Sequence, residues 1–262
     1  MQHKLGRLPA RHTRRTMRSA LAMARALDPL GPAPPVSNDY VAAVTAAWGM
    51  LGNDRLGDCV PADTGHALML RTANVSTIVV PTEANVVALY SAVTGFDPNA
   101  APDASGENPT DQGTDEVTMC QYMMSTGWLG HRSAGTGAVD PANLDHVRWC
   151  VQLFGSCRLG VTLPQSASDQ FDAGQPWDVA GNATIVGGHD VPIVKYDSSY
   201  FYVVTWGSLV PMTPAFLARY VANDQGEAHA ELYPDWIRSQ GLAPAGLDLA
   251  TLEADLRAIA AP

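Results

Sequence analysis

The spacing of apolar residues predicts helices in the first half of the chain. Between Cys59 and Ala73, apolar side chains recur every three or four positions, as they do on one face of a helix. A second helix is expected to begin near Pro81-Thr82-Glu83, followed by apolar residues with the same spacing up to Val93. Further helices are predicted at 16–27, 114–126 and 141–153.

The second half of the chain has a different pattern. After Gly155, short runs rich in Val, Ile, Tyr and Phe are bounded by turn residues, which is typical of strands. Strands are therefore predicted at 157–162, 190–196 and 200–206, with a tight hairpin at Asp197-Ser198-Ser199, and helices at 212–220 and 249–259. A helical half followed by a strand-rich half indicates an α+β fold with two lobes.

Two segments lack such periodicity. Residues 96–113 are rich in Pro, Asn, Asp and Gly and predict a long loop, and loops of this length are often functional. The Pro-rich residues 28–35 cannot form regular helix or sheet. We therefore expect residues 1–40 to be an extended N-terminal arm. Residues 41–262 are expected to form one domain, with a helical lobe at about 41–154 and a β-rich lobe at about 155–262.

Charge also distinguishes the N-terminal arm from the rest of the chain. Residues 1–25 contain seven basic side chains and no acidic one, whereas the whole chain of 262 residues has a net charge of −10. An acidic body is not expected to bind nucleic acid, so any such binding would involve residues 1–25. The arm could dock on the acidic body, on a protein partner such as a neighbouring subunit, or on a polyanion.

Composition excludes several other classes of protein. The chain has no run of about 18 apolar residues and no apolar run long enough for a signal peptide, so neither a membrane span nor secretion is expected. The four cysteines include no C-x-x-C pair, which argues against a structural zinc site and favours free buried thiols. We expect no metal and no cofactor.

The candidate chemistry lies in the segment Asn53-Asp-Arg-Leu-Gly-Asp-Cys-Val-Pro-Ala62. Cys59 follows a glycine turn and begins a predicted helix, with Asp58 as a natural N-cap. A helix N-terminus favours the thiolate because it carries a partial positive charge and free N–H groups. The segment Gly187-Gly-His189-Asp lies 130 residues downstream, a spacing used by papain-type cysteine and histidine pairs.

These residues resemble the papain-like cysteine peptidases. In that family, a glutamine six residues before the nucleophile helps to form the oxyanion hole, and Asn53 stands at that position. The dipeptide Trp206-Gly207 matches the family's Asn-Ser-Trp-Gly segment on the strand that pairs with the histidine strand. The resemblance covers about residues 45–220. It implies a papain-like two-lobe fold, a peptide or protein substrate, and catalysis by Cys59, His189 and Asn53.

One position departs from the family pattern. Val204 stands where the family has the asparagine that orients the histidine. Thr205 and Asp190 could replace it, but strand alternation would turn both away from His189 if Val204 faces the imidazole. A water molecule or a loop carboxylate, Asp111 or Asp115, is a further option.

Two neighbours of Cys59 also bear on its reactivity. The charge of Asp58 should disfavour the thiolate. His66 follows two helical turns after Cys59, about 10 Å away, and we expect it to be structural rather than a base.

Two functions follow from this resemblance. The first is a papain-like cysteine peptidase or related thiol amide hydrolase that uses Cys59 and His189, with residues 1–40 either as a prosegment or as an arm that threads onto a neighbour. The alternative is a catalytically silent papain-like module of a phage virion or other assembly, anchored by the arm. Segments 5–10, 48–54 and 232–236 resemble uncharacterised bacteriophage proteins, so a cytoplasmic location in the host cell or a place in the virion is expected. Other thiol hydrolases that open a helix with Asp-Cys fit less well, because they lack the Trp-Gly match.

Overall fold

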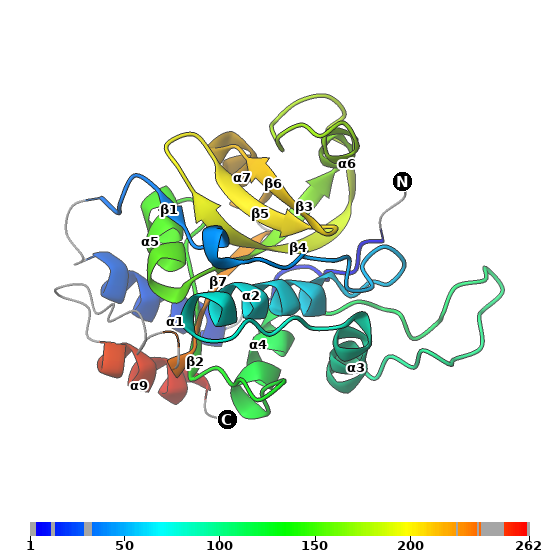
Figure 1. Cartoon of the computed structure of the whole chain (residues 1–262), viewed down its shortest axis with the longest axis horizontal. Coiled ribbons are helices and arrows are strands. Elements are labelled where there is room, and N and C mark those ends of the chain that lie inside the picture. The colour runs from blue at the N-terminus through cyan, green and yellow to red at the C-terminus, as the bar shows by residue number, and fades with distance from the viewer. Residues whose placement is uncertain are drawn as a thin grey trace.

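The computed structural model describes residues 4–11, 14–28, 33–223, 225–234, 236 and 249–260. Strands β3 to β6 form the upper part of the molecule in Figure 1, and a group of helices lies below them. These helices are α2 (Cys59–Val75), α3 (Glu83–Thr94) and α4 (Glu116–Ser125). Helix α2 contacts both α3 and β4, so it lies where the helices meet the sheet.

The sheet has seven strands in the order β2-β7-β3-β4-β5-β6, with the short β1 paired to β4, and all pairs are antiparallel. The three predicted strands are present as β3 (Cys157–Pro164), β4 (Ile185–Tyr196) and β5 (Phe201–Thr205). The strands not predicted from the sequence are β1 (Asn38–Asp39), β2 (Gly135–Ala138), β6 (Ser208–Met212) and β7 (Glu227–Leu232).

Strand β7 was missed because of its composition. Its sequence, Glu-Ala-His-Ala-Glu-Leu, combines charged and small residues, which are depleted in strands. All six residues are nevertheless buried, since β7 lies between β2 and β3 in the interior of the sheet. Its charged side chains therefore need partners inside the protein.

The predicted helices are present with ends shifted by a few residues. Besides α2 to α4 they are α1 (Arg14–Leu27), α5 (Leu144–Phe154), α7 (Pro214–Tyr220) and α9 (Leu249–Ala260). Helix α6 (Gln165–Asp172) and the 3-10 turn Val41–Ala43 were not predicted. Helix α3 is capped by Thr82, whose side chain forms a capping box with Asn85.

Helix α2 is buried on every side rather than on one face. All residues from Cys59 to Thr72 are buried. Small residues allow this close packing: a Cβ added at Gly65 would lie 2.9 Å from a side-chain carbon of Leu51. The N-terminus of α2, with Cys59, is therefore inside the protein.

The N-terminal region lies on the body of the protein. Helix α1 contacts β2 and α9. Residues 4–8 pass Thr114 and Gly188, with backbone hydrogen bonds to both. The expected extended arm is therefore not confirmed for these parts, which adopt the first of the three docking options, contact with the body itself. Residues 29–32 of the Pro-rich stretch lie outside the described residues.

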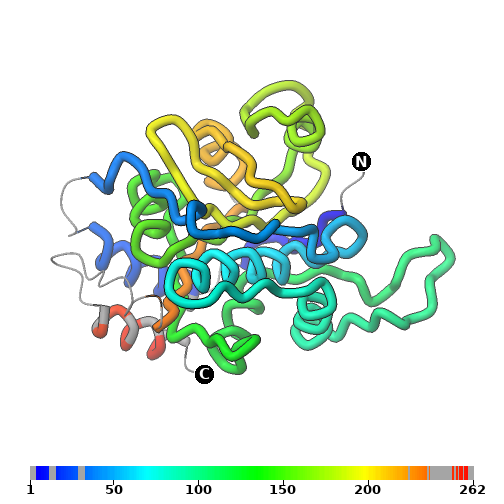
Figure 2. Tube along the Cα trace, in the orientation of Figure 1, coloured from blue at the N-terminus to red at the C-terminus, as the bar shows by residue number. Residues whose placement is uncertain are grey.

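The long loop predicted at 96–113 is present between α3 and α4 and projects from the body, as the teal-to-green trace in Figure 2 shows. It returns to the body near Asp111 and Gly113. Among the helices described, none is long and apolar enough to cross a membrane. The lobe boundary near residue 154 stays a prediction, and α5 and β2, which precede it, pack against β3, β4 and β7.

Candidate active site

Cys59 is the first residue of α2, as predicted, and only 1% of its surface is exposed. Burial, followed by the charge of Asp190, raises the pKa of the thiol to about 12. Backbone hydrogen bonds from Gly6 and Asp190 act in the opposite direction but do not offset this effect. The helix N-terminus was expected to favour the thiolate; in this closed arrangement burial outweighs it, and Cys59 is a neutral thiol at pH 7.

Asp58 occupies the predicted N-cap position of α2, but its side chain makes no capping hydrogen bond. It turns back toward Gly52, where an added Cβ would lie 2.6 Å from its Oδ2 atom. Burial and the nearby charge of Asp111 raise the pKa of Asp58 to about 8. The carboxyl group is therefore largely protonated at neutral pH, which weakens its expected repulsion of a thiolate.

Asn53 lies in a tight turn before the helix and is 3% exposed. Positive φ angles at Gly49, Leu51 and Gly52 shape this turn. The Nδ2 group of Asn53 donates hydrogen bonds to the carbonyl oxygens of Lys4 at 3.3 Å and Leu56 at 3.2 Å. The predicted oxyanion donor thus already binds a peptide carbonyl, that of the chain's own N-terminal segment.

His189 lies on β4 and is 1% exposed. Its Nε2 atom is hydrogen-bonded to the hydroxyl of Thr205 at 2.8 Å. The ring stacks on Trp206, with centroids 4.8 Å apart and planes inclined by 18°, and Trp177 packs edge-on at 6.4 Å. Trp206 and Gly207 form the two-residue turn between β5 and β6, both with positive φ, which brings the indole against the imidazole.

The residue that orients His189 is Thr205, which differs from the expectation from the sequence. Val203 pairs with Ile193, so Val203 and Thr205 share the sheet face of His189, whereas Val204 lies on the opposite face. There Val204 packs with Met69 and Val194. Val204 aligns with the family's asparagine in sequence but does not face His189, so the premise on which Thr205 would turn away is wrong.

The other candidate partners of His189 have different contacts. Asp190 accepts a hydrogen bond from Nη1 of Arg158 at 2.5 Å. Asp111 accepts from the backbone N–H of Gly57 and from Tyr90, and Asp115 caps α4. His66 is hydrogen-bonded to the carbonyl of Gly49, and burial lowers its pKa to about 4, in keeping with a structural role.

The site is covered by residues 4–8, which we call the strap. The backbone N–H of Arg7 donates to Gly188, that of Leu8 to Thr114, and that of Thr114 to Gly6. The strap therefore bridges the histidine strand, β4, and the end of the long loop, directly beside Cys59.

Two strap side chains fix it by charge. The Nζ atom of Lys4 lies 2.9 Å from Asp111 and 2.7 Å from Glu107. The Arg7 side chain is 1% exposed and donates from Nε to Glu116 at 2.8 Å and from Nη2 to Glu227 at 3.0 Å. One basic residue of the predicted arm, Arg7, is thus part of the protein interior, whereas Lys4 is only partly buried.

Arg7 belongs to a larger buried network of charges. Within it, Arg158 of β3 contacts Asp190 at 2.5 Å, Asp63 at 3.5 Å and Glu231 at 3.8 Å. Burial raises the pKa of Asp63 to about 7 and that of Glu116 to about 7. Of these residues only Asp190 was considered from the sequence, as a possible partner of His189 rather than of Arg158. Because the carboxylates come from α2, α4, β4 and β7, only the fold brings them together.

One group within this network has the composition of a metal site. The ligand atoms of Glu116, Glu227 and His229 lie within 4.8 Å of one another. The Arg7 guanidinium, however, already bonds both carboxylates. Arg7 bonds the Oε1 atom of each carboxylate, while Nε2 of His229 lies 2.9 Å from Oε2 of Glu227 and 3.8 Å from Oε2 of Glu116, so both carboxylates already have cationic or hydrogen-bonding partners from the chain itself.

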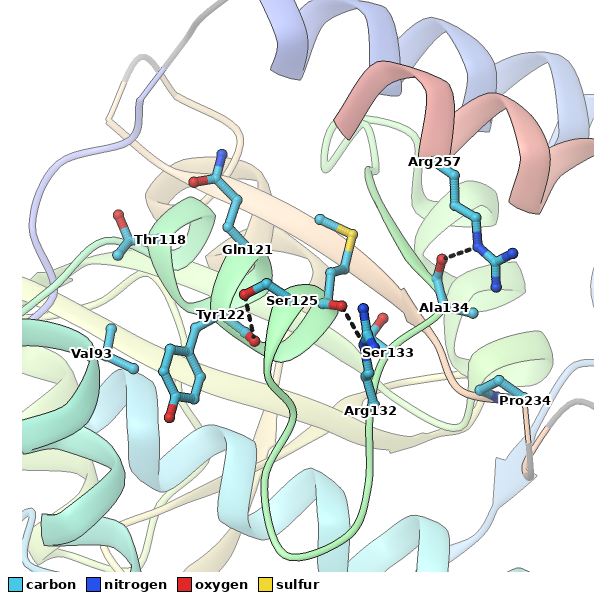
Figure 3. A pocket seen from close by; sticks show the side chains of 11 residues that line it. Val93, Thr118, Gln121, Tyr122, Ser125, Arg132, Ser133, Ala134, Pro234 and Arg257 are labelled. Atoms are coloured by element: carbon cyan, nitrogen blue, oxygen red, sulfur yellow. Dashed lines mark hydrogen bonds between the residues drawn. The ribbon is translucent and has the colours of Figure 1, made fainter. Parts of the chain in front are cut away.

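Little free volume is present at the candidate site. Cys59 and His189 both line a cavity of about 10 Å³, together with Asn53, Thr205 and Trp206 among others. A larger cavity of about 830 Å³ lies elsewhere, between α4, the start of β2 and α9, with Tyr122, Arg132 and Arg257 among its lining residues (Figure 3). Neither Cys59 nor His189 lines that cavity.

Comparisons with known proteins identify the fold. Xylellain, a cysteine protease from Xylella fastidiosa, superposes with a TM-score of 0.59 at 13% identity, covering 88% of this chain and 98% of that one. Procathepsin B from Trypanosoma congolense gives 0.55 at 12%, covering 87% and 86%. Digestive procathepsin L 3 from Tenebrio molitor gives 0.55 at 11%, covering 87% and 83%.

No protein-family model matches the sequence, and a search of curated proteins gives no match. At these identities the likeness establishes the fold alone. The chain has the papain-like two-lobe α+β fold, as the sequence predicted.

Proposed function

We propose that this protein is a papain-like cysteine peptidase, or a related thiol amide hydrolase, that is held latent by its own strap. The observation that carries the proposal is the shared cavity of Cys59 and His189, with Cys59 at a helix N-terminus and His189 held by Thr205. Asn53 supports it further, because its amide already donates to a peptide carbonyl.

The chemistry would proceed in two steps. In the first, His189 takes the thiol proton, Sγ of Cys59 bonds to the carbonyl carbon, and the C–N bond breaks as His189 gives that proton to the leaving amine. In the second, water attacks the thioester, the C–S bond breaks, and the thiol recovers a proton through His189. Asn53 and the backbone N–H of Cys59 would stabilise the oxyanion in both steps.

Latency follows from the contacts of the strap. With Gly6 beside the sulfur and the thiol pKa at about 12, the closed form has almost no thiolate. Release of the strap would hydrate Cys59, lower its pKa and free the donor group of Asn53. This agrees with the expectation that residues 1–40 include a prosegment.

The test uses the full chain with Gly6→Ala, since a Cβ at Gly6 would lie 1.9 Å from the carbonyl oxygen of Gly57 and should displace the strap. This variant should hydrolyse a mixed library of quenched fluorescent peptides, and its iodoacetamide labelling should titrate below about pH 8.5, the ordinary thiol pKa. Adding Cys59→Ala or His189→Ala should abolish hydrolysis.

A second outcome would favour the catalytically silent module. If Cys59 labels rapidly in the Gly6→Ala chain, showing that the strap is released, and no peptide is hydrolysed, the peptidase proposal fails. A relation to bacteriophage proteins and a protein partner for the N-terminal region stay predictions. Both can be tested by identifying proteins that co-purify with the wild-type chain and not with a chain lacking residues 1–40.

A further inference from the structure

The strap covers the candidate site, and its contacts indicate which peptide could bind there once the strap leaves. Three of its side-chain positions are constrained by different parts of the surrounding protein. This inference rests on the proposed function, because it concerns what the opened cleft would bind as substrate.

The position of Gly6 tolerates no side chain. A Cβ built there would lie 1.9 Å from the carbonyl oxygen and 2.3 Å from the Cα atom of Gly57, both backbone atoms. From the other side, a Cβ at Gly113 would lie 1.8 Å from the Gly6 carbonyl oxygen. Backbone cannot move aside as a flexible side chain can, so this point beside Cys59 accepts glycine alone.

The Lys4 side chain lies in acidic surroundings. Its ammonium group lies between Asp111, which is 1% exposed, and Glu107, which is largely exposed. The Lys4 carbonyl is the group held by Asn53. A basic side chain two residues before the glycine therefore gains one buried and one exposed carboxylate partner.

The surroundings of the Arg7 side chain are also acidic, and they are more deeply buried and more selective than those of Lys4. Its guanidinium meets Glu116, Glu227 and the carbonyl of Gln225 with three separate nitrogen atoms, at 2.8, 3.0 and 2.8 Å. An ammonium is a single point of charge on a flexible stem and cannot span these three acceptors. The residue after the glycine should therefore be arginine rather than lysine.

We infer that the opened cleft selects extended basic peptides of the pattern Lys-x-Gly-Arg. The strap carries this pattern as Lys4-Leu5-Gly6-Arg7, and its affinity for the cleft comes from the subsites that would select a substrate. The acidic character of the body, with a net charge of −10 for the chain, favours such basic partners over acidic ones.

Binding can be measured without catalysis. The receptor is the full chain with Gly6→Ala to release the strap and Cys59→Ala to prevent turnover. The probe is a fluorescein-labelled peptide with the sequence of residues 4–10, Lys-Leu-Gly-Arg-Leu-Pro-Ala, followed by fluorescence anisotropy. It should bind, and peptides with Gly→Ala, Arg→Lys or Lys→Glu should each bind at least about tenfold more weakly, the usual effect of losing a hydrogen bond to a charged group or of a steric clash.

Equal binding of the four peptides would overturn the inference. Failure of the parent peptide to bind would overturn it as well, when cleavage of the receptor's strap by an added protease shows that the strap is released. A second measurement covers the case in which the receptor does not fold. In the full chain, Lys4→Ala, Gly6→Ala and Arg7→Ala should each accelerate alkylation of Cys59, while Leu8→Ala, at an exposed strap position, should not. The same alkylation rate in all four variants would also overturn the inference.

These results are separable from the proposed function. Selective binding without hydrolysis by the Gly6→Ala chain would sink the peptidase and leave the specificity intact. Hydrolysis of peptides without the Lys-x-Gly-Arg pattern, at equal rates, would sink the specificity and leave the peptidase intact.

Discussion

Replacing Arg7 with methionine tests whether buried charge locks the strap over Cys59. The guanidinium makes three hydrogen bonds, to Glu116, Glu227 and the Gln225 carbonyl, and its side chain is 1% exposed. Methionine keeps the apolar stem but leaves two buried carboxylates without their shared cation. Removing one partner of a buried ion pair typically costs about 3–5 kcal/mol.

Most of this loss falls on the closed state, because Arg7 belongs to the strap and its partners can hydrate when the strap leaves. With the lower value of about 3 kcal/mol, the fraction of molecules with a released strap rises about 100-fold, since each 1.4 kcal/mol is about a factor of ten. Iodoacetamide labelling of Cys59 at pH 8, quantified by mass spectrometry, should accelerate by a similar factor. Cys59→Ala identifies the labelled thiol among the four buried cysteines.

Arg11→Met is the matched control. Arg11 pairs with Asp115 at 3.2 Å, but its side chain is 57% exposed, so the pair contributes only about 0–1 kcal/mol. The labelling rate of Cys59 in the Arg11→Met variant should therefore change less than about fivefold. An unchanged rate in Arg7→Met, or equal acceleration in both variants, would refute the reasoning.

The effect of Arg7→Met should also depend on pH. The pKa of Glu116 is raised to about 7 even though the charge of Arg7 lowers it, so removal of Arg7 should raise it further. A protonated carboxyl is less costly to bury than a charged one. The ratio of variant to wild-type labelling rates should therefore be largest at pH 8 and decrease toward pH 6. A ratio that grows on acidification would contradict this assignment.

Three further substitutions give independent tests. Thr205→Val removes the hydroxyl that holds His189, so kcat/KM of the strap-released chain should fall about 10- to 100-fold and Thr205→Ser should restore it, whereas a fully active valine variant would exclude the positioning role. Asp58→Asn should raise the Tm at pH 8–9 and change it little at pH 4. Folding raises the pKa of Asp58 from 3.8 to about 8, so the folded state binds more protons and loses stability as the pH rises through that window; equal Tm differences at both pH values would contradict this. Gly113→Ala should speed labelling of Cys59, because the added Cβ would lie 1.8 Å from the carbonyl oxygen of Gly6 in the strap. Gly130→Ala is the control, since Gly130 also has a positive φ but has open space around it, and it should not change the rate. Similar labelling rates in the two variants would argue against the clash.

The parts of the site predictable from sequence were those with a local signature. Cys59 was identified by a glycine turn followed by helical periodicity, and His189 by a glycine-flanked strand. Both signals are set by neighbouring residues, and the structure places the two side chains around one cavity. Their catalytic roles, and that of Asn53, stay proposals.

Thr205 was considered and set aside for a reason that the structure identifies. Alternation along a strand fixes which residues share a face, but not which face points to the histidine. That choice depends on the register between β4 and β5, where Val203 pairs with Ile193. Register is set by tertiary packing and by the β-bulge between Ile193 and Lys195, neither of which the sequence pattern of one strand reveals.

The buried charges could not be predicted for a related reason. Glu227, His229 and Glu231 alternate with alanine in a segment rich in residue types that are depleted in strands. Their neutralising partners, Arg7 and Arg158, are distant in the sequence. A carboxylate is stable inside a protein only when such a partner is present, so the burial of β7 depends on contacts that no local pattern encodes.

The same dependence links the stability of the fold to closure of the site. Within the buried network Arg158 belongs to the sheet, but Arg7 is supplied by the strap. The strap therefore cannot leave without depriving Glu116 and Glu227 of a cation. We expect that cost to keep Cys59 covered. The inferred preference for arginine over lysine rests on the same contacts, because the guanidinium spans Glu116, Glu227 and the Gln225 carbonyl with three separate nitrogen atoms.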